Sequence, residues 1–176
     1  MDGLDIRPIT PPDIPAVTPL LRGYLAGDGE APDGARAATL LLAMLESPLA
    51  HVCVAVHGGD PLGFIGWAWT FSPSRGQPVL RVLAIHTTPT AWRQGVGRAL
   101  LAHAEATARA AGAQRLELET DEGNVAARGL YRDRGFEEFP RKRVYMRFVD
   151  PVRGDARSRP VASAPSSGAQ GKGSSS

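Results

Sequence analysis

The segment from Trp92 to Arg98, with the sequence Trp-Arg-Gln-Gly-Val-Gly-Arg, constrains the fold of this chain more than any other. An apolar run from Val79 to Ile85 precedes it and a long alanine-rich pattern follows, which predicts a strand, a glycine-bearing turn and a helix. The first N–H groups of a helix have no partner within it, and the helix dipole favours negative charge there. Gly95 and Gly97 place no side chain in the way of a phosphate that approaches the main chain. The segment therefore predicts the binding of a phosphorylated cofactor.

The length and composition are those of one ordinary soluble domain. The chain has 176 residues, of which 43% are hydrophobic and 22% charged. The single cysteine, Cys53, excludes an internal disulfide and any multi-cysteine metal site, and its place in an apolar run predicts a buried, inert thiol. The four histidines are scattered along the chain, so we expect no metal site.

The net charge of +2 does not indicate binding to nucleic acid. Four basic residues and one acidic residue follow Pro151, which leaves the preceding part of the chain with a net charge of −1. No apolar run approaches the roughly 20 residues that cross a bilayer, and the acidic N-terminus, Met1–Asp5, does not have the pattern of a secretory signal. These features predict a cytoplasmic protein with neither a nucleic-acid nor a membrane partner.

The folded part of the chain is predicted to end near Asp150. Beyond it the sequence is rich in proline, glycine, serine and alanine and has no periodic apolar pattern. Such a segment cannot bury enough surface to offset the entropy lost on ordering. We therefore expect one domain over residues 1–150 and a disordered basic tail over residues 151–176.

The hydrophobic pattern of the domain alternates between strand and helix periodicity. It predicts strands over residues 4–9, 51–56, 62–71, 79–87, 116–120 and 143–149, and helices from about residue 13 to 25 and over 33–45, 98–111 and 124–134. The turn Gly58-Gly59-Asp60-Pro61 predicts a hairpin, whereas the helix between strands 79–87 and 116–120 makes those two strands parallel neighbours. The fold class is therefore α/β with a mixed sheet, in the order β-α-α-β-β-β-α-β-α-β.

Two blocks of residues are similar to those of a known family. The first is Gln94-Gly95-Val96-Gly97-Arg98-Ala99-Leu100-Leu101, and the second is Asn124-x-x-Ala127-x-x-Leu130-Tyr131-x-x-x-Gly135-Phe136. They resemble the acyl-carrier pyrophosphate loop, [RQ]-x-x-G-x-[GA], and the second cofactor block of the GNAT superfamily of acetyl-CoA-dependent N-acetyltransferases. The resemblance covers most of residues 4–149 and implies the GNAT-like acyl-CoA N-acyltransferase fold. It departs from the family pattern at Trp92, where the family usually has arginine or glutamine, and Arg93 comes one place late.

The resemblance implies that the ligand is acetyl-CoA, bound as a co-substrate. Main-chain N–H groups around Ile85–Thr87 would polarise the acetyl carbonyl, and Asn124 would lie near the cofactor arm, although it is equally suited to cap a helix. The cofactor-binding residues that it implies are Ile85, His86, Thr87, Arg93, Gln94, Gly95, Val96, Gly97, Arg98, Asn124 and Tyr131.

Acetyl transfer to an amine requires a base for the amine and benefits from an acid for the leaving thiolate. The family places a tyrosine where this chain has Tyr131, with its hydroxyl near the cofactor sulfur, so Tyr131 is the candidate acid. Glu119 matches a glutamate that acts as base in some relatives, the ribosomal-protein alanine acetyltransferases, although strand parity does not separate it from Glu117. His86 is the rival base, because the ordinary pKa of histidine suits proton transfer.

The activity expected from the resemblance is transfer of acetyl from acetyl-CoA to a primary amine by direct attack in a ternary complex. A small cationic amine is the leading acceptor, because the segment from Gly23 to Asp33 is rich in glycine and acidic residues, and Trp67 and Trp69 share one strand face. Core packing is the simpler role for the two tryptophans. The amine of a protein N-terminus or lysine is the alternative acceptor, and a catalytically silent acyl-CoA-binding module is the alternative function. A monomer or a homodimer is expected.

Overall fold

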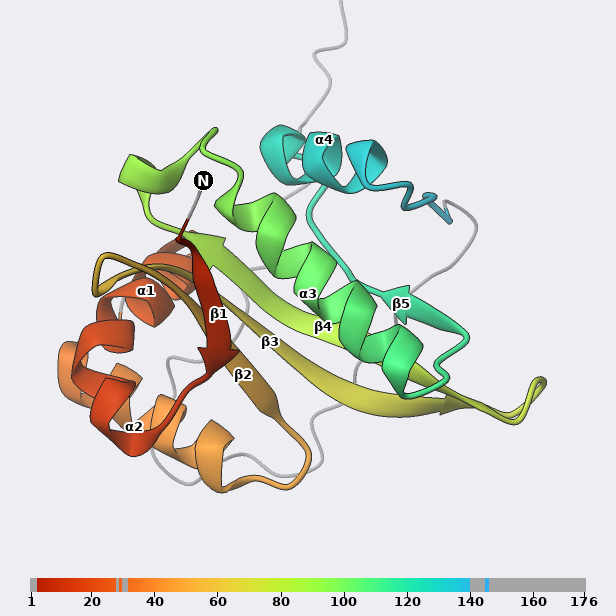
Figure 1. The fold of residues 1–176 in the computed structure, drawn as a ribbon, viewed down its shortest axis with the longest axis horizontal. Helices are drawn as coiled ribbons and strands as arrows, with labels where there is room; N and C mark the ends of the chain where they lie inside the picture. The colour runs from red at the N-terminus through yellow and green to blue at the C-terminus, as the bar shows by residue number, and fades with distance from the viewer. Residues whose placement is uncertain (1–2, 28, 30–31, 140–144, 146–176) are drawn as a thin grey trace, which may run out of the picture. The chain divides into compact units, whose positions relative to one another are not determined.

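The strands of the sheet lie side by side in the order in which they occur in the chain (Figure 1). The computed structural model describes residues 3–27, 29, 32–139 and 145, and its described strands and helices belong to one compact unit that ends at Glu138. The described strands are β1 (Asp5–Pro8), β2 (His51–His57), β3 (Asp60–Ser72), β4 (Gln77–Thr87) and β5 (Arg115–Glu117). The first three pairings are antiparallel and the pairing of β4 with β5 is parallel, as the sequence predicts.

The described helices are α1 (Ile14–Gly27), α2 (Gly34–Glu46), α3 (Val96–Ala110) and α4 (Val125–Asp133), with single 3₁₀ turns at Pro11–Asp13 and Pro89–Ala91. The Asp33 side chain accepts a hydrogen bond from the Arg36 N–H at 2.7 Å and so caps α2. Gly58 and Gly59 join β2 to β3 with φ angles of 59° and 93°, the two positive values that a two-residue hairpin turn requires.

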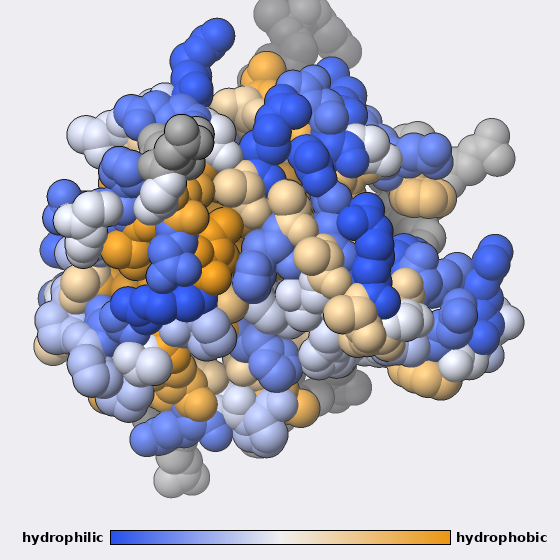
Figure 2. Space-filling view, in the orientation of Figure 1, coloured by the Kyte–Doolittle hydropathy of each residue, from blue (hydrophilic) through white to orange (hydrophobic). Residues whose placement is uncertain are grey.

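Helices cover both faces of the sheet. On one face α3 and α4 pack on the strands through a core that includes Ile65, Leu80 and Leu100. On the other face α1 and α2 pack through a second core that includes Leu41 and Phe64. Figure 2 shows mostly polar residues on the face that carries α3, with apolar residues gathered over β1 and α1. Cys53, 2% exposed, lies in the first of these cores, and burial raises the pKa of its thiol to about 11, which agrees with the predicted buried thiol.

A β-bulge interrupts β4 at Leu83. Gly66 of β3 pairs with Ala84 and Trp67 pairs with Val82, so Leu83 has no partner across the ladder. The extra residue reverses the faces of the strand. Val82 belongs to the core under α3, but Ala84, two residues later, belongs to the core under α1 and α2. Each side chain after Leu83 in β4 therefore points to the face opposite to the one that simple alternation along the strand predicts.

The structure moves several predicted boundaries. The third helix begins at Val96 rather than residue 98, because Gly95 takes the N-cap position, so Gly97 and Arg98 lie in its first turn. The strand predicted over 116–120 ends at Glu117, so Glu119 follows the strand instead of lying in it. The first helix continues through its prolines to Gly27, with the Thr18 hydroxyl donating to the Ile14 carbonyl.

Two predictions fall on residues that the structure does not describe. The strand predicted over 143–149 lies outside the described residues except for position 145, and the tail over 151–176 lies outside them entirely. Within the described part of the chain, no helix is both long and apolar enough to cross a bilayer.

Candidate active site

The predicted anion site lies at the start of α3. Gly95 adopts a φ of 87° at the N-cap, a left-handed conformation that favours glycine, and no side chain caps this helix start. A Cβ built on Gly95 would have no atom within 4 Å, so the space beside this residue is open. The N–H groups of the first turn of a helix have no intrahelical partner, so the binding of an anion here remains a prediction of the sequence.

Three elements meet at Gly97. A Cβ built there would lie 3.2 Å from Leu130 Cδ2 of α4 and 3.9 Å from Thr87 Cγ2 at the end of β4. The first turn of α3 is therefore packed against both α4 and the end of β4. The absence of a side chain at Gly97 therefore also lets the two helices approach each other.

The pairing of β4 with β5 covers only the first half of β4. It runs from Val79–Arg115 to Arg81–Glu117, whereas β4 continues to Thr87. No described strand pairs with β4 beyond that point on this side, and we call Val82–Thr87 the unpaired edge of β4. Its peptide groups that face away from β3 have no ladder partner among the described residues. The Leu83 and Thr87 carbonyls accept hydrogen bonds from the Tyr24 and Trp92 side chains, and the remaining groups can bind a ligand that lies along the strand. Ile85 and Thr87, both predicted cofactor residues, lie in this edge.

The described part of the chain places Tyr131 next to this junction. It lies on α4, follows Leu130, is 8% exposed and packs against Phe136 with ring centroids 5.9 Å apart. Burial raises the pKa of its hydroxyl, so the phenol keeps its proton at neutral pH and can donate it. The hydroxyl makes no hydrogen bond to another described residue. It is nevertheless not fully enclosed, since Trp67 Nε1 is the only buried side-chain polar atom without a partner in the described residues.

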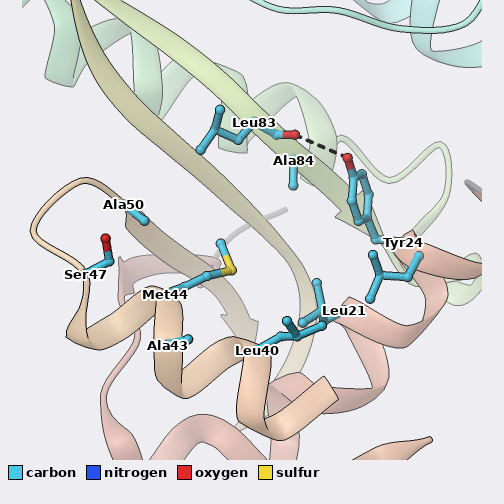
Figure 3. A pocket seen from close by; sticks show the side chains of 10 residues that line it. Leu21, Tyr24, Leu40, Ala43, Met44, Ser47, Ala50, Leu83 and Ala84 are labelled. Atoms are coloured by element: carbon cyan, nitrogen blue, oxygen red, sulfur yellow. Dashed lines mark hydrogen bonds between the residues drawn. The ribbon is translucent and has the colours of Figure 1, made fainter. Parts of the chain in front are cut away.

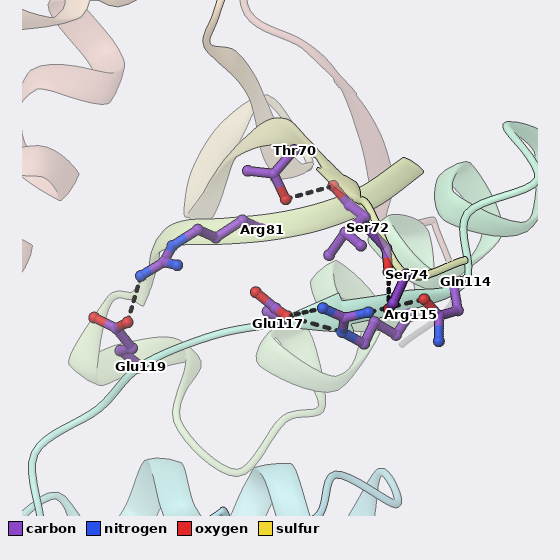
Figure 4. Close-up of polar contacts among 9 residues, drawn as sticks. Thr70, Ser72, Ser74, Arg81, Gln114, Arg115, Glu117 and Glu119 are labelled. Atoms are coloured by element: carbon purple, nitrogen blue, oxygen red, sulfur yellow. Dashed lines mark hydrogen bonds and ion pairs between the residues drawn. The ribbon is translucent and has the colours of Figure 1, made fainter. Parts of the chain in front are cut away.

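Glu119 lies where the chain leaves β5. Its carboxylate forms an ion pair with the guanidinium of Arg81, the last residue of β4 that pairs with β5 (Figure 4). Glu117 pairs instead with Arg115 of the same strand. The two glutamates, which strand parity does not distinguish, thus have different surroundings. Glu119 lies at the beginning of the unpaired edge, whereas Glu117 lies inside the paired part of the strand.

His86 lies on the face of the unpaired edge that α1 covers. A Cβ built on Gly23 would lie 2.6 Å from His86 Nε2, so the imidazole packs directly against α1. Burial lowers the pKa of His86, which keeps the imidazole neutral and able to accept a proton at neutral pH. Gly23 lies inside α1, so the glycine-rich and acidic segment from Gly23 to Asp33 begins within this helix. The sequence alone did not associate Gly23 with His86.

The polar side chains around the start of α3 have separate partners. Gln94 Nε2 donates to the Thr90 carbonyl at 2.5 Å, and Arg98 pairs with Asp133 of α4 at 3.4 Å. Arg93 adopts a φ of 61° and has no ion-pair partner among the described residues. Trp92, where the sequence departs from the family pattern, donates from Nε1 to the Thr87 carbonyl at 3.2 Å. Its indole therefore holds the end of the unpaired edge.

Two other predicted residues serve the helices. Asn124 caps α4 by accepting the Ala127 N–H at 3.2 Å, the structural role that the sequence left open. Asp33 caps α2, whereas the acidic residues at 28 and 30 lie outside the described residues. Trp67 is 5% exposed in the core under α3 and Trp69 packs against the same core, so both serve packing.

The comparisons with known proteins agree with this arrangement. The sequence profile of the acetyltransferase (GNAT) family matches residues 18–136. The chain belongs to the GNAT family. A curated relative from Bacillus subtilis (strain 168), the uncharacterized N-acetyltransferase YhfO, is 31% identical over 135 residues, which cover 77% of this chain and 91% of YhfO.

Solved structures of other acetyltransferases show the same fold. The crystal structure of a probable acetyltransferase has a TM-score of 0.75 and 24% identity, and the match covers 84% of this chain and 99% of that one. The structure of AAC(6')-Iy in complex with the bisubstrate analog CoA-S-monomethyl-acetylneamine has a TM-score of 0.69 and 21% identity, with 82% and 98% covered. This GNAT protein is therefore an acyltransferase, and its fold supports the binding of acyl-CoA.

Proposed function

We propose that the protein transfers the acetyl group of acetyl-CoA to the primary amine of a small cationic molecule. The observation that carries this proposal is the junction at Gly97. There an open, uncapped helix start, the unpaired edge of β4 and the helix that carries Tyr131 come together. Such a junction offers donors for a phosphorylated ligand at one end and an acid near its other end.

The residues at the junction fit the two ends of acyl-CoA. The N–H groups of the first turn of α3 would bind the diphosphate, supported by the side chains of Arg93 and Arg98. The arm of the co-substrate would lie along the unpaired edge, where peptide N–H groups of Ile85–Thr87 would bind the thioester carbonyl oxygen. Gln94 and Val96 contribute main-chain groups at the helix start, and Asn124 fixes the start of α4.

In the proposed reaction the amine nitrogen attacks the thioester carbon directly, in a complex that holds both substrates. A C–N bond forms and the C–S bond breaks. The proton lost by the amine goes to a base, Glu119 in our proposal, and Tyr131 gives its proton to the departing sulfur. Within the described residues Cys53 is the only cysteine, and its thiol is buried with a raised pKa, so no acetyl-enzyme is proposed.

His86 is the alternative base. It packs against α1, whereas Glu119 lies after β5 and binds Arg81. Arg81 lies between Leu80 and Val82, which face α3, so both candidates lie on the face of the sheet opposite to α3. Glu119 is 57% exposed on its side chain and bound to Arg81, whereas His86 is half-buried and neutral.

A thiol-release assay with acetyl-CoA across a panel of amines tests the proposal. We expect release of coenzyme A with at least one small amine and little with peptides that carry a free N-terminus or lysine. Tyr131→Phe should lower kcat about 10- to 1,000-fold while coenzyme A still binds, because only the proton donor is removed. A protein that binds coenzyme A yet consumes acetyl-CoA with no amine would instead be a silent binding module.

A further inference from the structure

An apolar groove lies on the face of the sheet opposite to α3. Its walls come from α1, α2 and the bulge in β4, and its volume is about 470 Å³ (Figure 3). The lining residues are Leu21, Tyr24, Leu25, Leu40, Ala43, Met44, Ser47, Ala50, Leu83 and Ala84. This volume falls within the range of pockets that enclose small organic molecules.

None of the ten residues that line the groove carries a charge. The polar groups on its walls are the hydroxyls of Tyr24 and Ser47, and that of Tyr24 donates to the Leu83 carbonyl at 3.2 Å. Leu40 and Leu83 leave 39% and 46% of their surface exposed, which is unfavourable in water unless a ligand covers them. A ligand with several positive charges would lose its hydration here without meeting a carboxylate among these lining residues.

The groove is continuous with the unpaired edge of β4. Leu83 and Ala84 form part of its wall and directly precede Ile85–Thr87, where the proposed thioester would lie. The bulge produces this continuity, because it turns Ala84 towards α1 and α2 while Val82 faces α3. His86 lies on the same face as Ala84. Its imidazole packs against α1 at Gly23, the residue before Tyr24. A molecule in the groove can therefore present one end to the strand.

We propose that this groove holds the apolar body of the acceptor, so that the acceptor is a primary monoamine with an aliphatic or aromatic body. The proposal rests on the amine-acetyltransferase function above and narrows it. The single amino group points to the unpaired edge of β4, and the remainder of the molecule lies between α1 and α2. Polyamines and aminosugars fit this surface poorly, because each further ammonium group would be buried without a counter-charge.

Acceptor competition and calorimetry test this assignment on the full chain. In the thiol-release assay, kcat/KM for 2-phenylethylamine or hexylamine should exceed that for spermidine or neamine by about tenfold or more, since burial of the body adds favourable free energy. In titration calorimetry, 2-phenylethylamine should bind the coenzyme A-loaded protein with a negative heat-capacity change, the mark of buried apolar surface.

Leu40 and Leu42 provide a matched pair of variants on α2. They are 39% and 41% exposed, but only Leu40 lines the groove. Leu40→Glu should weaken the binding of 2-phenylethylamine about tenfold or more and favour spermidine, because it adds a carboxylate to the apolar wall. Leu42→Glu should change neither. Circular dichroism of both variants confirms that α2 remains folded.

The outcomes separate this proposal from the function on which it rests. Turnover that prefers spermidine, or equal effects of Leu40→Glu and Leu42→Glu on amine binding, would overturn the groove as the acceptor site and leave the acetyltransferase function intact. Binding of 2-phenylethylamine that Leu40→Glu abolishes, without turnover of any amine, would support the groove and contradict the function. If Leu40→Glu converts a dimer into a monomer in sedimentation without changing amine affinity, a second copy covers the groove and the proposal is wrong.

Discussion

The Arg81 guanidinium binds the Glu119 carboxylate at the position where β4 and β5 stop pairing. Arg81 is the last residue of β4 in the parallel ladder, and Glu119 is the second residue after the end of β5. The ion pair thus ties the departing chain to β4 just before the unpaired edge begins. The side chains are 38% and 57% exposed, so the pair adds little to stability and is available for a role in the site.

Glu119→Gln tests the proposed base. We expect kcat/KM for the amine to fall about 100-fold or more, with a change in the free energy of unfolding of less than about 1 kcal/mol, because the pair is exposed. Kinetics and urea denaturation measure the two quantities. Glu117→Gln is the matched control, since its ion pair with Arg115 lies within β5. Equal activity of the two variants would leave His86 as the base.

His86 has a stability signature that is independent of catalysis. Burial lowers its pKa in the folded protein from the ordinary value of 6.5. As the pH falls below 6.5, the unfolded chain therefore takes up a proton at this residue while the folded protein does not. The free energy of unfolding decreases with falling pH until His86 is protonated in the folded protein as well. His86→Gln should remove this loss, so the stability advantage of the wild type over the variant should shrink between pH 7.5 and pH 5.

Urea denaturation at several pH values measures that difference. His57→Gln, at an exposed position at the end of β2, is the control for removing an imidazole from the unfolded chain. A gap between wild type and His86→Gln that stays constant across this pH range would show that the imidazole is not held in its neutral form. His86→Gln in the activity assay shows whether His86 contributes to the pH dependence of kcat.

The parts of the site that the sequence predicted are those governed by local backbone chemistry. The glycine-bearing turn predicted before the third helix is present, with Gly95 at its N-cap, and Asn124 caps α4 as its side chain favours. The Gly58–Gly59 hairpin follows in the same way from two residues that tolerate positive φ. In each case the residues that determine the conformation are adjacent in the chain.

The parts that the sequence did not predict depend on residues distant in the chain. The bulge at Leu83 arises from the register between β3 and β4, and it reverses the faces of all later residues of β4. The groove that results needs Tyr24 and Leu83 together, which are 59 positions apart. The packing role of Gly97 likewise depends on Leu130. No local pattern contains this information.

Gly97→Val separates helix packing from cofactor binding at the junction. The larger side chain would push against Leu130, so the free energy of unfolding should fall by about 1–3 kcal/mol and coenzyme A should bind more weakly. In a Leu130→Ala background, Gly97→Val should lower the free energy of unfolding much less than it does in the wild type. The alanine leaves room for the methyl groups of the valine. We expect coenzyme A affinity in calorimetry to stay low in the double variant. Recovery of affinity together with stability would mean that Gly97 serves packing only.

The hydroxyl of Tyr24 joins α1 to the bulge, and its loss should affect turnover more than folding. Tyr24→Phe keeps the edge-to-face contact with Phe64, whose ring centroid is 6.1 Å away, and removes the donor to the Leu83 carbonyl. The free energy of unfolding should fall by about 0.5–1 kcal/mol in urea denaturation, the usual value for one neutral hydrogen bond. Because the bulge positions both the groove and the unpaired edge, kcat/KM for the amine should fall about 5- to 50-fold while the Kd for coenzyme A stays the same. A variant with reduced stability and unchanged kcat/KM would assign Tyr24 to the stability of α1 alone.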